Sequence, residues 1–348
     1  MKKNLLTILS MLLVFSVILA GCSEKSDEEI KTKSQLEVIK KRGKLVGGVN
    51  ATIPGFGYVA SDGSYEGMDI DITRAVAAAI FGDPTAVEFR PLSAEERFIA
   101  VQTGEVDVLA RNTTHTTSRD ASVGLAFAPV TFYDGQGMMV RKDSGIESLA
   151  DLEGSRIAVE SGTTTELNLA DQMRKIGVSY EPVVFDNQDA AISAYEQGSV
   201  DAFTTDRSGL VSRRSTLSKP DDHFILTEVL SKEPLAPSVK DGDSKFVAVV
   251  SWTVYALIQA EEYGITKGNI ETFMDSDDPE IRRFLGVEGD LGEQLGLEKD
   301  FVVQVIKAVG NYGELYDRHL GPETVFNLER GPNELWTNGG LMYSPPFR

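Results

Sequence analysis

The sequence predicts an α/β protein with two lobes, a hinge between them and a C-terminal helical extension. Strand-like and helix-like segments alternate from about Ser34, as expected for mainly parallel sheets covered by helices. The alternation occurs as two successive units with the same order of elements but no sequence identity, which indicates two similar lobes rather than a repeat array. A length of 348 residues fits about two domains.

The first residues predict a secretion signal. Lys2 and Lys3 precede an uncharged run over residues 5–20, which is shorter than the roughly 20 apolar residues of a transmembrane helix. The run ends in LAGC, where Cys22 is the only cysteine of the chain, and this sequence resembles the lipobox of bacterial lipoproteins. We expect a signal peptide over residues 1–21, lipid attachment at Cys22 and a polar tether over residues 22–34. The alternative is an ordinary signal peptide with an incidental cysteine.

The first unit is predicted to be βαβαβ. Leu36 and Ile39 share a helical face that ends at Gly43, and residues 44–50 form a buried strand. Further segments have strand periodicity at 87–89 and 106–110, and helical periodicity around 72–80. A second helix is predicted to begin with Ser93 and Glu96 as a capping box and to bury Phe98 and Val101.

The second unit begins near residue 140. Its predicted elements are strands at 156–160, 181–185 and 201–206, with helices after the first two. Segments around Gly135 and Gly137, and around Pro234 and Pro237, connect the units as a hinge. We therefore expect one lobe to comprise residues 35–137 and 236–348, the other to comprise residues 138–235, and a cleft to lie between them.

The remaining third of the chain is mostly helical. Apolar residues recur with helical spacing over 246–258 and 301–309. The final segment is rich in turn residues around Leu335, Trp336, Leu341, Met342 and Tyr343, and we expect it to fold back onto the body of the protein.

Composition excludes several kinds of partner. The net charge of -19 argues against nucleic acid, since phosphate binding needs clustered Lys and Arg. A single cysteine allows neither an internal disulfide nor a thiolate zinc site. His115, His223 and His319 have no metal-binding spacing, the acidic stretch 275–280 lacks the glycine of a calcium loop, and no phosphate-binding glycine motif occurs. We expect no metal and no cofactor.

Polar residues follow several predicted strands, where ligands of open α/β sheets bind. These strand-end residues are Asn50, Thr52, Arg111, Asn112, Thr114, His115, Arg119, Thr163, Thr164, Thr165 and Asp206. They suit a zwitterion: Arg119 and the helix start at 162–164 offer donors to a carboxylate, and Asp206 offers an acceptor to an ammonium. Taken singly, Thr163 with Glu166 could be a helix cap, Asp206 another cap, and Arg119 a solvated charge.

Several segments resemble the polar amino-acid-binding proteins of ABC importers. TTHTTSR at 113–119 is similar to that family's Thr-x-Thr-x-x-Arg loop, and GMDID, GEVD, SGTTTE and VDAFTTD follow in the family's order. RNTTHTTSRD, YDGQGMMVRK, SKEPLAPSV and RGPNELWTNGGLMY resemble its long-tailed branch, the general L-amino-acid-binding proteins. The resemblance covers essentially the whole mature chain and implies a two-lobe periplasmic-binding-protein fold of type II.

The resemblance also implies roles for individual residues. Arg119 would clamp the ligand α-carboxylate, assisted by the Thr114 hydroxyl and the N–H groups of Asn112 and Thr164. Asp206 would pair with the α-ammonium, helped by the Arg111 carbonyl.

Other positions bear on side-chain selection. Asn50 stands where binders of basic amino acids often carry an acid, which argues against a strict Lys or Arg preference. Ile53 stands where many relatives place an aromatic residue that stacks on the ligand. Candidate side-chain selectors are Thr52, Thr165, Glu95 and Arg97.

The implied function is capture of an L-amino acid outside the cytoplasmic membrane, hinge closure, and delivery to a permease with cytoplasmic ATPase subunits. We expect a monomer that is held to a membrane by its lipid. Two alternatives stay open. One is an enzyme such as a dehydratase, using Glu95, Glu160 or His115 as general acid; the other is a ligand presenter for a membrane receptor.

Overall fold

The computed structural model describes residues 34–348, and residues 35–348 form one compact unit. The predicted signal peptide, Cys22 and all but the last residue of the predicted tether lie outside the described residues. Within residues 34–348, no helix has both the length and the apolar character needed to cross a membrane.

Lobe one is the part of the chain built on a five-stranded sheet of order β5-β1-β6-β14-β7. Its strands are β1 (Leu45–Val49), β5 (Val87–Pro91), β6 (Val108–Ala110), β7 (Leu125–Phe127) and β14 (Ser238–Lys240). Helix α2 (Gln35–Arg42) precedes the first strand, and the helices between the strands are α3 (Met68–Phe81), α4 (Glu96–Thr103) and α5 (Thr117–Ser122). β1, β5 and β6 are parallel, whereas β14 runs antiparallel to its neighbours because it returns from the other lobe.

Lobe two is built on a sheet of order β10-β9-β11-β8-β12. Its strands are β8 (Phe132–Arg141), β9 (Arg156–Glu160), β10 (Glu181–Phe185), β11 (Ala202–Asp206) and β12 (His223–Ile225). Its helices are α6 (Thr164–Ile176), α7 (Gln188–Glu196) and α8 (Arg207–Ser215), with short 3-10 turns at Lys142–Ser144, Leu149–Leu152 and Pro220–Asp222. The strands predicted at 156–160 and 181–185 are confirmed residue for residue.

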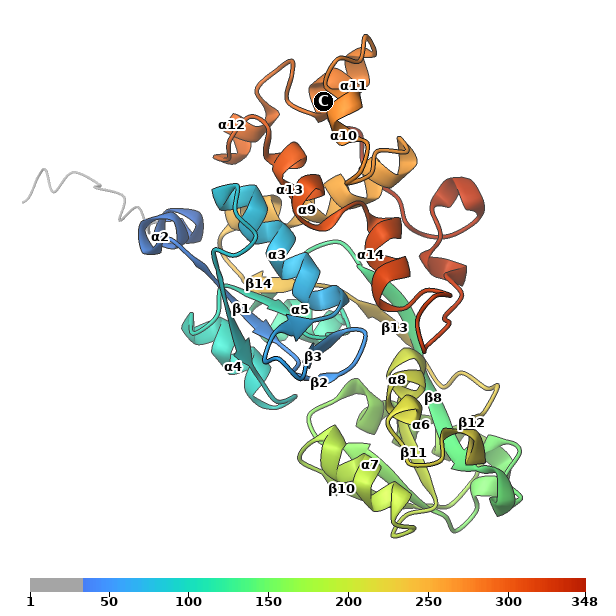
Figure 1. Ribbon diagram of the computed structural model, residues 1–348. Coiled ribbons are helices and arrows are strands. Elements are labelled where there is room, and N and C mark those ends of the chain that lie inside the picture. The colour runs from blue at the N-terminus through green and yellow to red at the C-terminus, as the bar shows by residue number, and fades with distance from the viewer. Residues whose placement is uncertain (1–33) are drawn as a thin grey trace, which may run out of the picture. The chain divides into compact units, whose positions relative to one another are not determined.

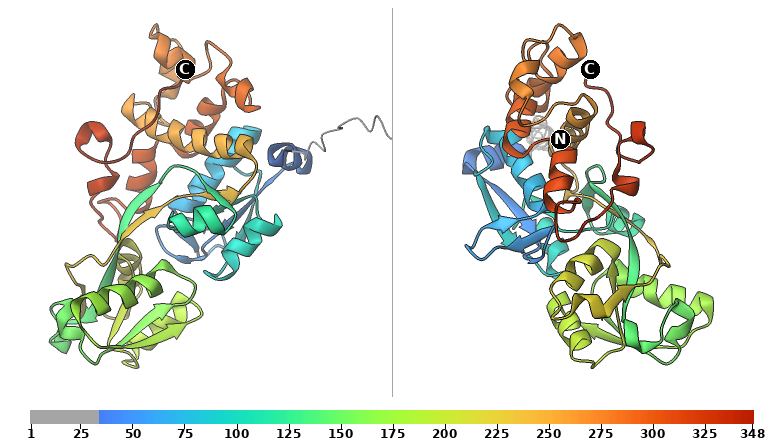
Figure 2. Two further views of the ribbon diagram at one scale, coloured as in Figure 1. Left: turned by 180° about the vertical axis from the view of Figure 1, so that it is seen from behind. Right: turned by 45° about the vertical axis from the view of Figure 1, so that its right-hand side comes forward.

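The hinge consists of two antiparallel strands. β8 pairs with β13 (Lys232–Leu235), and an isolated bridge joins Leu235 to Thr114 of lobe one. β8 runs from lobe one into the sheet of lobe two (Figures 1 and 2). The glycine-containing hinge segment is therefore a continuous strand.

A small antiparallel sheet was not predicted. It comprises β2 (Thr52–Ile53), β3 (Gly57–Val59) and β4 (Tyr65–Glu66). These strands are too short to show an alternating pattern in the sequence. Gly67 ends this sheet with φ 127°, and a Cβ there would lie 2.2 Å from the carbonyl oxygen of Phe56, so only glycine fits the start of α3.

The C-terminal extension packs on lobe one. Its helices are α9 (Ser244–Glu262), α10 (Ile270–Phe273), α11 (Pro279–Phe284), α12 (Leu291–Leu295), α13 (Phe301–Val309) and α14 (Tyr312–His319), followed by 3-10 turns at Gly331–Asn333 and Trp336–Asn338. α13 and α14 lie against α3 and α9 (Figure 1). In the final segment Leu335 and Met342 are buried, as expected, whereas Trp336, Leu341 and Tyr343 are exposed.

Candidate binding site

A cavity lies between the two lobes, at the carboxyl ends of β6, β9 and β11. Eight of the residues predicted for the site line it: Arg97, Arg111, Asn112, Thr114, Thr163, Thr164, Thr165 and Asp206. Ile53, Glu160, Gln188, Thr205 and Gly209 complete the lining. The rule that ligands bind where strands end therefore brings most of the predicted residues together.

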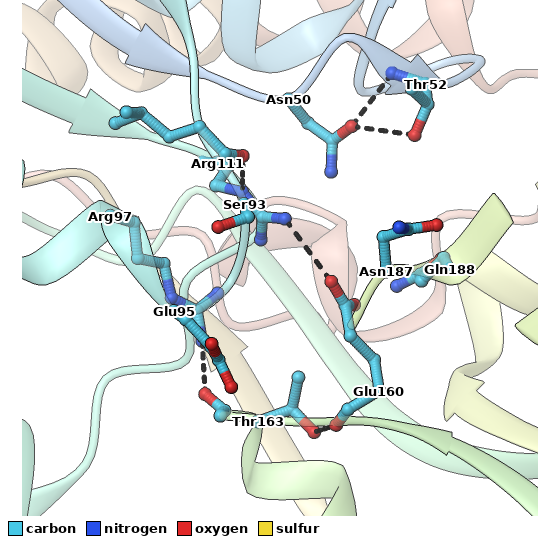
Figure 3. A network of polar contacts seen from close by, with 12 residues as sticks. Asn50, Thr52, Ser93, Glu95, Arg97, Arg111, Glu160, Thr163, Asn187 and Gln188 are labelled. Atoms are coloured by element: carbon cyan, nitrogen blue, oxygen red, sulfur yellow. Dashed lines mark hydrogen bonds and ion pairs between the residues drawn. The ribbon is translucent and has the colours of Figure 1, made fainter. Parts of the chain in front are cut away.

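The two lobes contact each other beside this cavity. Its volume is about 30 Å³, enough for a water-sized molecule. Ser161 Oγ of lobe two donates to Glu95 of lobe one at 2.7 Å, and an Arg97 nitrogen donates to the Gly162 carbonyl at 3.3 Å. Figure 3 shows Glu160 and Thr163 of lobe two beside Glu95 and Arg97 of lobe one. Entry of an amino acid therefore requires the lobes or these side chains to move.

Two buried arginines lie near one aromatic ring. The guanidinium carbons of Arg97 and Arg119 are 4.7 Å and 5.0 Å from the ring centre of Phe98. Arg119 also donates to the Thr114 carbonyl at 2.9 Å, although it does not itself line the cavity. The capping box of α4 is present as predicted, with Ser93 and Glu96 exchanging hydrogen bonds.

The Arg97 guanidinium is buried and has few hydrogen-bond partners among the described residues. It is 3% exposed, its Nε has no hydrogen-bond partner among the described residues, and the Gly162 carbonyl accepts from its terminal nitrogen. Burial lowers its pKa well below the usual range and the positive charges of Arg111 and Arg119 lower it further, whereas the carboxylates of Glu160 and Asp206 raise it. A guanidinium keeps its proton in proteins, so this direction marks a site that an anion would stabilise.

The first turn of α6 faces the same cavity. Thr163 caps it by accepting from the Glu166 N–H at 3.2 Å, so the cap reading of Thr163 is correct, although no reciprocal bond from the Glu166 side chain is found among the described contacts. The N–H groups of Thr164 and Thr165 have no helical carbonyl to bond. Together with the helix dipole, these N–H groups could bind an anion in the cavity.

Asp206 is the last residue of β11, and it brings a carboxylate to the lining of the same cavity. It occupies the N-cap position of α8 but makes no capping hydrogen bond, so the alternative reading of Asp206 as a cap is wrong. Burial raises its pKa well above the usual range, as do the carboxylates of Asp134 and Glu233, whereas Arg97 and Arg119 lower it. A cation placed beside Asp206 would relieve this penalty.

Residues of the loop after β6 make contacts within the protein that we did not predict from the sequence. The Asn112 N–H donates to Asp69 Oδ2 at 2.8 Å, so it is not free to bind a ligand carboxylate. Burial raises the pKa of Asp69 to about 6, although this N–H and the charge of Arg111 lower it. The Arg111 carbonyl accepts from Thr113, and its guanidinium lies 3.7 Å from Glu160.

Three other candidates lie at the margin of the site. Asn50 is buried and accepts from the Thr52 N–H at 2.9 Å, and Thr52 Oγ1 accepts from Arg213 of lobe two at 2.9 Å. Neither Asn50 nor Thr52 lines the cavity. His115 stacks on Phe127 with ring centres 4.3 Å apart and lines a different cavity, which hinge residues also line, so the expectation that it lines this cleft is wrong.

Sequence reasoning missed Phe98 as the base for both arginines, Gln188 in the lining, and Glu233 behind it. Phe98 was assigned to the core of α4, where it is in fact half-buried. No local pattern marks Glu233, because its hydrogen-bond partners Thr114 and Thr164 lie far away in sequence.

Comparison with known proteins agrees with this architecture. Residues 45–267 match the family described as bacterial extracellular solute-binding proteins, family 3. The chain is 50% identical to the general L-amino acid-binding periplasmic protein AapJ of Rhizobium johnstonii, over 90% of this chain and 92% of that protein. It is 48% identical to the glutamate/glutamine/aspartate/asparagine-binding protein BztA of Rhodobacter capsulatus, over 90% and 94%.

A solved structure is similar over nearly the same length. It is an ABC transporter / periplasmic binding protein from Brucella ovis with glutathione bound, with a TM-score of 0.89 and 50% identity over 91% of this chain and all of that one. The family match covers more than half of the chain, and the two-lobe fold is the one predicted. The chain belongs to the bacterial extracellular solute-binding proteins, family 3.

Proposed function

We propose that this protein binds L-amino acids between its lobes and delivers them to an ABC importer. The observation that carries the proposal is one cavity whose lining includes both hydrogen-bond donors suited to an anion and a carboxylate suited to a cation. Arg97 and the start of α6 provide an anion-binding subsite, Arg119 lies next to the lining residue Thr114, and Asp206 provides an acceptor for an ammonium. The name of the relative AapJ and the description of the Brucella ovis protein support this reading.

We further propose that ligands with a second carboxylate or an amide are favoured. Arg119 would hold the α-carboxylate, which leaves Arg97 as a buried donor whose Nε has no partner among the described residues. A side-chain carboxylate that reached Arg97 would compensate its charge. The name of BztA, which states binding of glutamate, glutamine, aspartate and asparagine, supports this assignment.

The cellular setting is part of the proposal. We propose an extracytoplasmic protein with a cleaved signal peptide over residues 1–21 and a lipid anchor on Cys22, on the basis of the LAGC sequence. It would act as a monomer that presents its closed form to the permease, with lobe one over residues 35–137 and 236–348. No cofactor is needed for this role.

A binding protein accounts for the site better than an enzyme. Glu160 pairs with Arg111, and Glu95 accepts from Ser161, so both candidate acids are engaged in structural contacts. His115 faces another cavity. A dehydratase would need a proton donor directed at the ligand.

The test is calorimetric titration of refolded, ligand-free protein with the twenty L-amino acids. We expect one-to-one binding, tightest for L-glutamate and its close analogues. Arg119→Ala should weaken binding about 10²–10³-fold, since the ligand carboxylate loses a buried partner worth about 3–5 kcal/mol. Arg174→Ala is the matched control, because the Arg174 side chain is 80% exposed.

Two results would contradict the proposal. Absence of binding by all twenty amino acids would show that Arg119 and Asp206 do not form a zwitterion clamp. A loss below tenfold for Arg119→Ala would place the carboxylate elsewhere in the cavity. Turnover of arogenate or prephenate by the purified protein would favour the enzyme.

A further inference from the structure

Glu233 lies on hinge strand β13 and is 1% exposed, yet its carboxylate accepts hydrogen bonds from both lobes. Its Oε2 accepts from Thr114 Oγ1 of lobe one at 2.6 Å and from Thr164 Oγ1 of lobe two at 3.0 Å. Its Oε1 accepts from Asn168 Nδ2 at 2.7 Å and from Ser231 Oγ. Each oxygen therefore has two donors.

This arrangement fixes the direction of two hydroxyl groups. An ionised carboxylate only accepts hydrogen bonds, so Thr114 and Thr164 must direct their hydroxyl hydrogens at Glu233. Because a hydroxyl has a single hydrogen, each threonine oxygen can then interact with other partners only through its lone pairs. Both threonines line the interlobe cavity, with their Oγ1 atoms 3.4 Å apart, whereas Glu233 lies behind them.

The cavity therefore receives two adjacent acceptors from these threonines. A ligand carboxylate would meet lone pairs there, whereas an ammonium would meet two acceptors in addition to Asp206. We infer that Glu233 is a positioning residue that turns the Thr114 and Thr164 hydroxyls into acceptors for the α-ammonium of the ligand. The inference rests on the proposed amino-acid function, and it moves Thr114 from the carboxylate to the ammonium of the ligand.

The substitution Glu233→Gln should reverse the direction of the Thr114 and Thr164 hydroxyl groups, and it hardly changes the size of the side chain. Asn168 donates to Oε1, so the new amide oxygen should stay beside Asn168 and the amide nitrogen should face the threonines. Thr114 and Thr164 would then accept from this nitrogen and turn their hydrogens into the cavity.

The experiment measures dissociation constants of the full-length protein for L-glutamate and for glutarate, which lacks only the α-ammonium. Glutarate is measured by displacement of labelled L-glutamate. For Glu233→Gln we expect the affinity for L-glutamate to fall at least about tenfold more than that for glutarate, because hydrogen bonds to a charged group are lost. Ser231→Ala is the matched control: it removes a donor from the far oxygen of Glu233 and should leave the ratio of the two affinities unchanged.

Thr164→Val provides a second reading if Glu233→Gln does not fold, as judged by thermal unfolding. We expect its loss to fall on L-glutamate far more than on glutarate. Equal losses for the two ligands, or an unchanged affinity of Glu233→Gln for L-glutamate, would overturn the inference and leave the proposed function standing. A wild-type protein that does not bind L-glutamate would contradict the favoured ligand class and overturn this inference with it.

Discussion

Phe98 brings two like charges together at the candidate site. Arg97 and Arg119 would repel each other in a buried setting, but each guanidinium lies near the same ring, whose negative face attracts both. The arrangement holds two donors in place before a ligand arrives. A dianionic ligand would then gain affinity, because little side-chain ordering remains to be done.

We predict that Asp206 makes ligand binding dependent on pH. Its pKa is well above the usual range in the free protein, and an ammonium beside it would lower that pKa. Affinity should therefore fall as the pH decreases through the raised pKa, because binding must then release a proton. Calorimetry in two buffers of different ionisation enthalpy measures this proton release.

Asp206→Asn should abolish the proton release and weaken L-amino acids far more than their des-amino analogues. The Asp134 carboxylate raises the pKa of Asp206, and burial raises the pKa of Asp134 itself to about 6, so Asp134→Asn is the necessary control. The same proton release in wild type and Asp206→Asn would assign the effect to Asp134 instead.

The sequence allowed prediction of the residues that follow strands, because strand ends converge in any open α/β sheet. Thr163, Thr164 and Asp206 were predicted in this way, and all three line the interlobe cavity. Hydrogen-bond direction could not be predicted, since it depends on contacts such as that between Thr114 and Glu233, 119 positions apart. The Asn112 N–H illustrates the same limit, because it donates to Asp69 of α3, which is distant in sequence.

At the scale of elements, the C-terminal extension is joined to the hinge. The Asn333 side chain accepts from the Tyr133 N–H at 2.6 Å and donates to the Tyr133 carbonyl at 3.1 Å, near the start of β8. Asn333 is 3% exposed, and its carbonyl accepts from Arg330, which pairs with Glu261 of α9. The C-terminal extension therefore holds the start of β8, the strand that continues into the sheet of lobe two, in place.

Asn333→Ala should lower the free energy of unfolding by about 1–3 kcal/mol, because both backbone groups of Tyr133 lose their partner. Chemical denaturation followed by circular dichroism measures the change. Asn338→Ala is the control, since Asn338 is exposed and its contact with Glu334 is long, at 3.5 Å. Equal stability of the two variants would mean that water replaces the Asn333 contacts.

Helical periodicity predicted the long elements well, as α3, α9 and α13 show, because one face of each is buried over several turns. The strand predicted at 106–110 begins at Val108 instead. Strand direction was predicted less well, since whether β14 runs parallel or antiparallel depends on where the chain returns from lobe two.

At the scale of the whole molecule, the extension completes the core of lobe one. Phe347 is 7% exposed and lies 4.9 Å from the rings of both Trp252 and Phe284, measured between ring centres. Leu335 and Met342 belong to the same core. The family match ends at residue 267, yet the helices beyond it cover α3 and α9.

Deletion of residues 329–348 should therefore destabilise the protein by at least about 3 kcal/mol, through the loss of buried apolar side chains and of the Arg330 partner of Glu261. Denaturant unfolding followed by Trp252 fluorescence measures the change. Tyr343→Ala, at an exposed position of the same segment, should cost far less. A deletion variant that unfolds at the wild-type denaturant concentration would show that the extension is only peripheral.

The core shared by the two ends of the chain also constrains its biosynthesis. Leu45 of β1 and Phe347 belong to one hydrophobic cluster, whereas lobe two is encoded between them and has clusters of its own. While the ribosome is still adding the last residues, lobe two can already be whole, but lobe one cannot. The lobe that begins first is therefore the one that finishes folding last.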